Sequence, residues 1–239
     1  MEILLIALLT LLASAVGTLS GFGTSTIMIP VLAVFLPPVE AIFLVAIIHW
    51  FGNIWKVALF RRGFHLGLAA LFGFTGLAAS YIGASVSLAA ESTMLLRLLG
   101  MFLFGYALFL FIKARYKVPA TGVTAAAGGA LSGFFAGMFG IGGAVRGMFL
   151  TAFDLPKAVY IATAGAIGLM VDSTRIITYF AGGATLPDRL WWGLALFIPL
   201  SFLGAKLAKR VVVRIPQENF RKVVAVFLLL VGLKLVAFP

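Results

Sequence analysis

The sequence predicts an all-α membrane protein made of two inverted repeats, each a glycine-broken helical hairpin followed by three transmembrane helices. Three observations lead to this fold class. The chain is 63% apolar and only 10% charged, whereas soluble domains are about half apolar and about a quarter charged. Several apolar runs are long enough to cross a bilayer. Two other apolar regions are interrupted by glycine clusters that recur at a fixed distance along the chain.

The long apolar runs define the expected transmembrane helices. Such a helix needs about 20 residues, because ~30 Å of hydrocarbon is crossed at ~1.5 Å per residue. The runs that meet this length are Val39–Phe60, Leu66–Ile82, Thr93–Ile112, Lys157–Phe180, Leu190–Lys206 and Phe220–Phe238. The lipid bilayer is therefore an expected partner of the chain.

Composition also excludes several classes of function. The net charge is +11, but the basic residues are few and dispersed, so they form no phosphate-tracking stripe and no nucleic-acid partner is expected. The absence of cysteine excludes disulfides and thiolate metal sites. No group of histidines and carboxylates has the pattern of a metal site, and no cofactor is expected.

Two further apolar regions each contain a glycine-rich break. The first covers residues 3–36 and breaks at 17–25, and the second covers residues 122–153 and breaks at 139–143. As helices, the arms after the breaks would reach only ~15–17 Å, about half the membrane. Irregular backbone at membrane depth is tolerated where it is buried in protein or lines an aqueous cavity. Each break is therefore a candidate site.

The two broken regions belong to a longer repeat with an offset of 119 residues. Gly21 and Gly23 align with Gly140 and Gly142. The same ungapped register aligns Leu36-Pro37 with Leu155-Pro156, and Asn53, Lys56, Phe60 and Gly63 with Asp172, Arg175, Tyr179 and Gly182. We therefore expect two halves, residues 1–118 and 119–239.

The distribution of basic residues predicts the orientation of these halves. Three full crossings per half is an odd number, so the halves are inverted if both broken hairpins return to their starting side. Twelve of the 18 basic residues then fall on one face: Arg61, Arg62, Lys113, Arg115, Lys117, Lys157, Lys206, Lys209, Arg210, Arg214, Arg221 and Lys222. Cytoplasmic loops concentrate Lys and Arg. We expect a multi-pass inner-membrane protein with both termini outside the cytoplasm, on the face that also carries Glu2 and Arg189.

The half-helices after the breaks predict an anion site. A helix N-terminus presents unpaired N–H groups and about half a positive charge. The candidate ligand-binding residues at the breaks are Gly21, Gly23, Thr24, Ser25, Gly140, Gly142, Gly143 and Arg146. Arg146 is the only charged residue from Ala120 to Thr151, and charge inside a membrane is costly enough to indicate function. We expect it to contact substrate; the alternative is that it pairs with Asp172 or backbone carbonyls and only stabilises the fold.

Five polar residues within the later spans are secondary candidates. Asp172 and Arg175 are three residues apart on one helix face, so an ion pair is as well supported as a ligand role for Arg175. Asn53 and Lys56 occupy the matching repeat positions, and Lys56 also has the alternative of extending to the interface. His49 has two interpretations, a proton relay or anion contact and a bond to a backbone carbonyl. The coupling ion stays open between H⁺, carried by Asp172, and Na⁺ at the half-helix ends.

The glycine breaks also resemble a known family. Gly21-Phe-Gly-Thr-Ser-Thr-Ile-Met-Ile-Pro30-Val-Leu and Gly137-Met-Phe-Gly-Ile-Gly-Gly-Ala-Val-Arg146 are similar to the duplicated signatures of the TauE/SafE sulfite-exporter-like family, as is Pro156-Lys followed by Ala162-Thr163 and Asp172. The resemblance spans essentially the whole chain. It implies transport of small organosulfur anions (sulfite, sulfoacetate or other sulfonates), with the glycines of both breaks lining the site. The sequence departs from the family pattern at Thr24-Ser25, where more glycine is usual, and at Met148-Phe149, which replaces a proline.

Together these features predict a secondary carrier and not an enzyme. The small anion would be held by two half-helix N-termini and Arg146, and one repeat would rock against the other to give alternating access. The alternatives are an anion channel with the same positive funnel and a carrier of small carboxylates. An intramembrane hydrolase using Ser20 and His49 is a third interpretation. The sequence leaves transport direction and oligomeric state open, a homodimer included.

Overall fold

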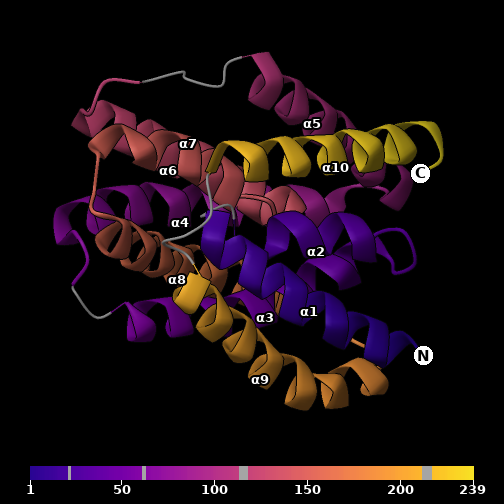
Figure 1. Cartoon of the computed structure of the whole chain (residues 1–239). Helices are drawn as coiled ribbons and strands as arrows, with labels where there is room; N and C mark the ends of the chain where they lie inside the picture. Colours follow the sequence, from indigo (N-terminus) through magenta and orange to yellow (C-terminus); the bar gives the residue numbers. More distant parts are fainter. Residues whose placement is uncertain (21–22, 61–62, 113–117, 212–216) are drawn as a thin grey trace.

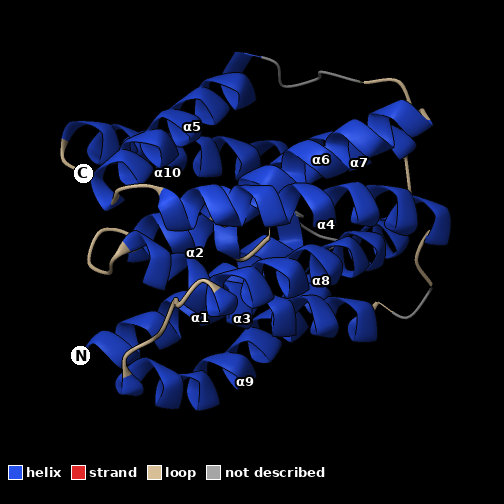
Figure 2. Cartoon of the chain, turned by 180° about the vertical axis from the view of Figure 1, so that it is seen from behind, coloured by secondary structure: helices blue, strands red, loops and turns tan. Residues whose placement is uncertain are grey.

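The computed structural model describes residues 1–20, 23–60, 63–112, 118–211 and 217–239, and their regular secondary structure is all helical (Figures 1 and 2). The helices are α1 (Glu2–Ser20), α2 (Ser25–Leu32), α3 (Pro38–Leu59), α4 (Leu66–Ala89), α5 (Ser92–Ile112), α6 (Gly122–Phe139), α7 (Gly143–Leu150), the short 3₁₀ helix η1 (Thr151–Phe153), α8 (Lys157–Ala181), α9 (Asp188–Val211) and α10 (Gln217–Ala237). These residues include no strand, and the predicted all-α class is confirmed.

Two helices are longer than the apolar runs that predicted them. α4 continues to Ala89, past the expected end at Ile82, because its small residues pack against α6; a Cβ on Gly83 would overlap the Phe134 carbonyl. α9 continues past Lys206 to Val211. Its last turn carries Lys209 and Arg210, which favour a helix C-terminus. Small or basic residues lower the hydropathy of a segment without ending its helix.

Six described helices are long and apolar enough to cross a membrane, namely α3, α4, α5, α6, α8 and α9. α6 is the first arm of the second broken region and is not among the runs expected to cross the membrane, but its length and composition qualify it. α6 alone has 18 residues, which span ~27 Å. In α10, side chains are described from Ala225 to Ala237. This apolar stretch is shorter than the length that the comparison requires.

Both predicted breaks are present. α1 is followed by the eight-residue α2, and α6 by the eight-residue α7. Gly140 ends α6 in the left-handed conformation, with φ +71°, and its N–H donates to the Ala136 carbonyl at 2.8 Å. Gly23 before α2 is also left-handed, with φ +82°. Glycine adopts this conformation without the steric cost that other residues meet, so the chain can reverse here and pack α2 on α1 and α7 on α6.

The packing of the helices is reciprocal between the two halves. α4 packs against α6, and α1 packs against α9 (Figure 1). With an offset of 119 residues, α1 corresponds to α6 and α4 to α9, so these two contacts are equivalent. α3 packs against α8 and α5 against α10, so each of these helices contacts its own counterpart. Reciprocity of this kind is expected from a two-fold axis; the inverted orientation of the halves stays a prediction.

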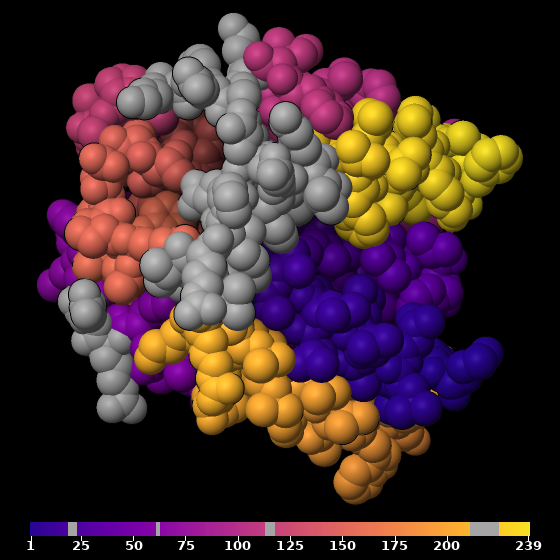
Figure 3. Space-filling view, in the orientation of Figure 1, coloured from indigo at the N-terminus to yellow at the C-terminus, as the bar shows by residue number. Residues whose placement is uncertain are grey.

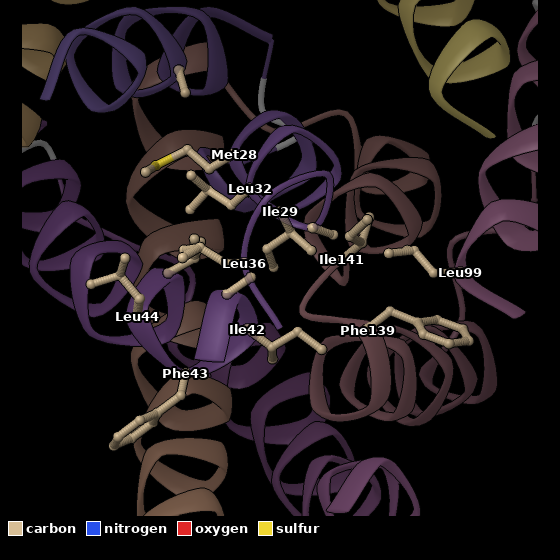
Figure 4. Close-up of a cluster of buried hydrophobic side chains, with 14 of the residues drawn as sticks. Met28, Ile29, Leu32, Leu36, Ile42, Phe43, Leu44, Leu99, Phe139 and Ile141 are labelled. Carbon is tan, nitrogen blue, oxygen red and sulfur yellow. The ribbon is translucent and has the colours of Figure 1, made fainter. Parts of the chain in front are cut away.

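The first half-helix is fixed in the main hydrophobic core. Met28, Ile29 and Leu32 of α2 are fully buried. They lie among side chains of α3 and of the second break, including Ile42 and Ile141 (Figure 4). α2 and α7 also contact each other. The core therefore holds the N-terminus of α2 close to the second break.

The two chain ends lie on the same side of the helix bundle but apart from each other, one beside α9 and the other at the end of α10 (Figure 1). Arg189 at the start of α9 forms an ion pair with Glu2, with 3.1 Å between Nε and Oε2. The N-terminal segment lies between α9 and α10 on the face shown in Figure 3. Glu2 and Arg189 are thus on one face, as the charge distribution predicted.

Candidate functional site

A buried polar cluster lies between α3 and α8, centred on Asp172. Asp172 Oδ2 accepts a hydrogen bond from Asn53 Nδ2 at 2.8 Å and lies 2.8 Å from His49 Nδ1. Its other oxygen, Oδ1, lies 2.9 Å from Arg175 Nε. All four side chains belong to residues that are at most 3% exposed. Two residues of α3 and one of α8 therefore surround both oxygens of this carboxylate.

Helical spacing explains how α3 supplies its part of the cluster. His49, Asn53 and Lys56 are separated by four and three residues, so they share one face of the helix. Lys56 Nζ donates to Asn53 Oδ1 at 3.0 Å, and Lys56 is only 5% exposed. The alternative in which Lys56 extends to the membrane interface is wrong, because its ammonium turns inward to this amide.

His49 and Arg175 have defined protein partners. The alternative in which His49 bonds a backbone carbonyl is wrong, because its Nδ1 lies against Asp172. Arg175 forms the ion pair with Asp172 that the three-residue spacing suggested. Its Nη1 also donates to the Ala136 carbonyl at 3.2 Å, near the end of α6, while its Nε and Nη2 are buried and make no hydrogen bond to the described residues.

Arg146 is buried without a comparable partner. It is 3% exposed, and its Nε makes no hydrogen bond to any residue that the structure describes. No ion pair or side-chain hydrogen bond joins its guanidinium to another residue in the described part of the chain. It lies close enough to Asp172 and Arg175 for their charges to interact with its own. The alternative in which Arg146 is satisfied by Asp172 or by carbonyl groups therefore does not describe this structure.

The cluster has a surplus of positive charge. The buried charged residues in the described ranges are Lys56, Arg146, Arg175 and Asp172. Three basic side chains thus face one carboxylate. The two guanidinium groups keep their charge, so at least one positive charge has no buried counter-charge. An unpaired buried charge costs several kcal/mol. This arrangement favours an anion as the missing partner.

The two glycine breaks meet at this cluster. A Cβ placed on Gly23 would lie 3.0 Å from His49 Nε2 and 3.8 Å from the Cα of Gly143. Thr24 and Ser25 follow directly and are each 1% exposed. The Thr24 side chain makes no capping hydrogen bond to α2. The N-termini of α2 and α7 therefore come together beside His49.

The other predicted glycines have different surroundings. A Cβ on Gly140 would lie 2.9 Å from Arg175 Nη1, so this glycine leaves room for the guanidinium. A Cβ on Gly142 would overlap the Ser132 carbonyl of α6. Gly142 is thus required for the packing of α7 on α6. Gly21 lies outside the described residues.

The family of the chain follows from its sequence match. The family model described as Sulfite exporter TauE/SafE matches residues 6–235. The chain belongs to the TauE/SafE family. The family implies a multi-pass membrane transporter of sulfite or related sulfur anions, and its members are not enzymes. No curated protein and no solved structure matches the chain.

The structure of this TauE/SafE protein also places residues at the site that the sequence reasoning did not select. Tyr106 donates its hydroxyl to the Ala144 carbonyl at 3.2 Å and thereby anchors the start of α7. Tyr160 lies in electrostatic reach of Arg146. Gly168 leaves room for the Asn53 amide. A tyrosine hydroxyl within an apolar span is a signal for a buried partner, and Gly168 aligns with His49 in the 119-residue register.

Proposed function

We propose that this TauE/SafE protein is a secondary transporter of a small organosulfur anion, such as sulfite, sulfoacetate or another sulfonate, in the cell inner membrane. The observation that carries the proposal is the buried Arg146 guanidinium without a protein counter-charge in the described structure. A bound anion would neutralise this charge, and the fixed donors of a guanidinium fit an oxyanion.

The junction of the breaks supplies donors for such an anion. The first N–H groups of α2 and α7 have no acceptors within their own helices, and an oxyanion at a helix N-terminus accepts from such groups. Thr24 and Ser25 add hydroxyls, and Gly143 lets a ligand approach the backbone. Arg175 Nη2, which has no hydrogen-bond partner among the described residues, is a secondary contact, as is Lys56. In this scheme Asp172 has a structural role: it accepts a hydrogen bond from Asn53 and forms an ion pair with Arg175.

The position of the cluster supports an alternating-access mechanism. Asn53 and Asp172 are repeat-equivalent, 119 residues apart, and they bond to each other at 2.8 Å. Residues related by a two-fold axis can touch only at that axis, so the cluster lies where the two proposed halves meet. An anion bound here contacts both halves. Rocking one half against the other would expose it to each side of the membrane in turn.

A transport assay distinguishes the carrier from an anion channel. Proteoliposomes are loaded with unlabelled sulfoacetate and diluted into a trace of labelled sulfoacetate, with protein-free liposomes as the control. A carrier exchanges the two pools, so label transiently accumulates above its external concentration and the rate saturates. Equilibration without accumulation would identify a channel. Exchange with neither sulfoacetate nor sulfite would refute the proposed function.

A binding screen tests the substrate class independently of transport. The purified protein is heated with sulfite, sulfoacetate, taurine, sulfate or simple carboxylates. A ligand that binds only the folded state raises the melting temperature with its concentration. We expect sulfite or a sulfonate to raise the melting temperature. If only carboxylates raise it, the substrate is a small carboxylate and not an organosulfur anion.

A further inference from the structure

We propose that His49 is the proton site of this transporter, so that one proton moves with the anion in the same direction. The proposal rests on the proposed function and adds the coupling ion. It starts from one geometric observation: one ring nitrogen of His49 is held by Asp172, while the other is buried at the junction of the two breaks and has no partner among the described residues.

The Asp172 contact fixes the hydrogen on one side of the ring. His49 Nδ1 lies 2.8 Å from Asp172 Oδ2. A carboxylate only accepts hydrogen bonds, so Nδ1 carries the hydrogen in this contact. In a neutral ring Nε2 is then an acceptor with a free lone pair. The pairing with Asp172 therefore also fixes which nitrogen is free to take up a proton.

Nε2 faces the place proposed for the anion. It is buried and has no hydrogen-bond partner in the described part of the chain. It lies 3.0 Å from the position of a Cβ on Gly23, and that position is 3.8 Å from the Cα of Gly143. Gly23 has no side chain to occupy the space. The free nitrogen thus faces the N-termini of both half-helices.

This geometry links the proton to the anion. The anion oxygens and a neutral Nε2 are both acceptors, so they repel each other. Once Nε2 takes a proton from water on the loading side, its new N–H donates to an anion oxygen. When the anion leaves on the other side, the N–H bond breaks and the proton returns to water. Binding is reciprocal: each ligand raises the affinity for the other.

The charged neighbours of His49 reinforce this linkage. Asp172 and Arg175 face it from α8, and Lys56 from its own helix. Arg146 of α7 adds a further positive charge to the cluster. α2 carries no charged residue. The charged residues of α9 are at its ends, and α5 carries only Arg97. The surplus cations make a further charge on His49 costly in an empty site, and a bound anion removes that cost.

The same contacts disfavour sodium at Asp172. Both carboxylate oxygens face nitrogen donors, from His49, Asn53 and Arg175. A sodium ion coordinated by Asp172 would have to displace at least one of these donors. A proton at His49 Nε2 requires no such rearrangement.

The test measures sulfoacetate transport in proteoliposomes with and without a proton gradient. Sulfoacetate keeps its charge near neutral pH, so the gradient does not alter the substrate. Exchange without a gradient tests the proposed function. An outside-acid gradient, with the membrane potential clamped by potassium and valinomycin, tests coupling. We expect the gradient to raise lumenal sulfoacetate several-fold, and a lumenal dye to report acidification that depends on sulfoacetate.

The variant His49→Asn and its control His65→Asn make the test specific. The amide introduced by His49→Asn can keep a bond to Asp172 at the place of Nδ1, but it offers no group at the place of Nε2. We expect slower exchange and a ratio of gradient-driven to gradient-free accumulation that falls to about one. His65 is exposed and caps α4 by accepting from the Leu68 N–H at 3.2 Å. Asn is also a good N-cap, so His65→Asn should keep the full ratio.

Each outcome decides a different claim. Gradient-free exchange by the unaltered protein, with no gradient stimulation and no lumenal acidification, would overturn proton coupling and leave the proposed function standing. If the proton gradient still stimulates sulfoacetate accumulation by His49→Asn, the proton binds at a residue other than His49. Absence of exchange by the unaltered protein would remove both proposals. If His49→Asn does not fold, the acidification measured with the unaltered protein decides the coupling alone.

Discussion

Asp172 and Arg146 are both buried charges, but their removal should have opposite effects on stability. Asp172→Asn leaves Arg175 buried without its counter-charge, and breaking a buried pair in this way costs about 3–5 kcal/mol. Arg146→Met removes a charge that has no ion pair in the described structure and replaces it with an apolar side chain of similar length. We expect Asp172→Asn to lower the melting temperature measured in detergent without anion, and Arg146→Met to hold or raise it.

The comparison also tests the surroundings of Arg146. If Arg146→Met loses as much stability as Asp172→Asn, the guanidinium has a structural partner, and the account of an unpaired charge is wrong. The control replaces a different basic side chain by methionine. Lys56→Met does not serve, because Lys56 Nζ donates a hydrogen bond to Asn53. Arg189→Met does serve, since Arg189 is exposed and its ion pair with Glu2 contributes little to stability.

Sequence reasoning can find the candidate residues at this scale but not their partners. A charge or a histidine within an apolar span stands out in the sequence, and this pattern identifies His49, Lys56, Arg146, Asp172 and Arg175. Their partners depend on which helix face meets which neighbour. The position of Lys56 near the end of its span suggests the interface, whereas its face of α3 points to α8.

The break after α6 needs glycine for two reasons, conformation and space. Gly140 has φ +71°, and a Cβ there would overlap Ile29 and crowd Arg175. Gly183 has φ +83°, but a Cβ there would have nothing within 4 Å. Gly183→Ala should cost about 1–2 kcal/mol of stability from backbone conformation alone and leave transport unchanged. Gly140→Ala should lose a further ~1–3 kcal/mol through overpacking and reduce transport.

Thermal unfolding and sulfoacetate exchange check this pair of variants. Equal losses of stability at the two positions, with transport intact in both, would show that the space at Gly140 is not needed to keep Arg175 in place.

The length of each helix was harder to predict than the existence of the breaks. Glycine clusters mark a break directly, but the small residues after Ile82 in α4 carry little hydrophobicity and still form helix against α6.

The whole molecule is proposed to contain two inverted halves, and equivalent positions test this. Leu66 and Thr185 are 119 residues apart, both are exposed, and the chain has no cysteine of its own. Inverted halves place these positions on opposite sides of the membrane. A membrane-impermeant maleimide should label Thr185→Cys in intact spheroplasts and Leu66→Cys only after permeabilisation. Labelling of both from one side would contradict the inversion.

At this scale the sequence predicts the order of the helices well, because hydropathy and the repeat act along the chain. The sequence does not predict which helices pack against each other. The contact of α4 with α6 and of α1 with α9 crosses between the proposed halves. It depends on small residues that allow close approach, such as Gly133 against Gly76 and Gly204 against Leu11. No single segment of the sequence carries that information.

The most direct test of the account compares sulfoacetate exchange by Arg146→Met and Arg189→Met in proteoliposomes with equal amounts of inserted protein. Both variants lose one guanidinium, but only Arg146 is buried at the junction of the breaks. We expect Arg189→Met to exchange at the rate of the unaltered protein. Arg146→Met should exchange sulfoacetate at least about 100-fold more slowly. This factor corresponds to a loss of ~2.8 kcal/mol of anion stabilisation. Equal exchange by the two variants would show that the buried charge of Arg146 does not bind the transported anion.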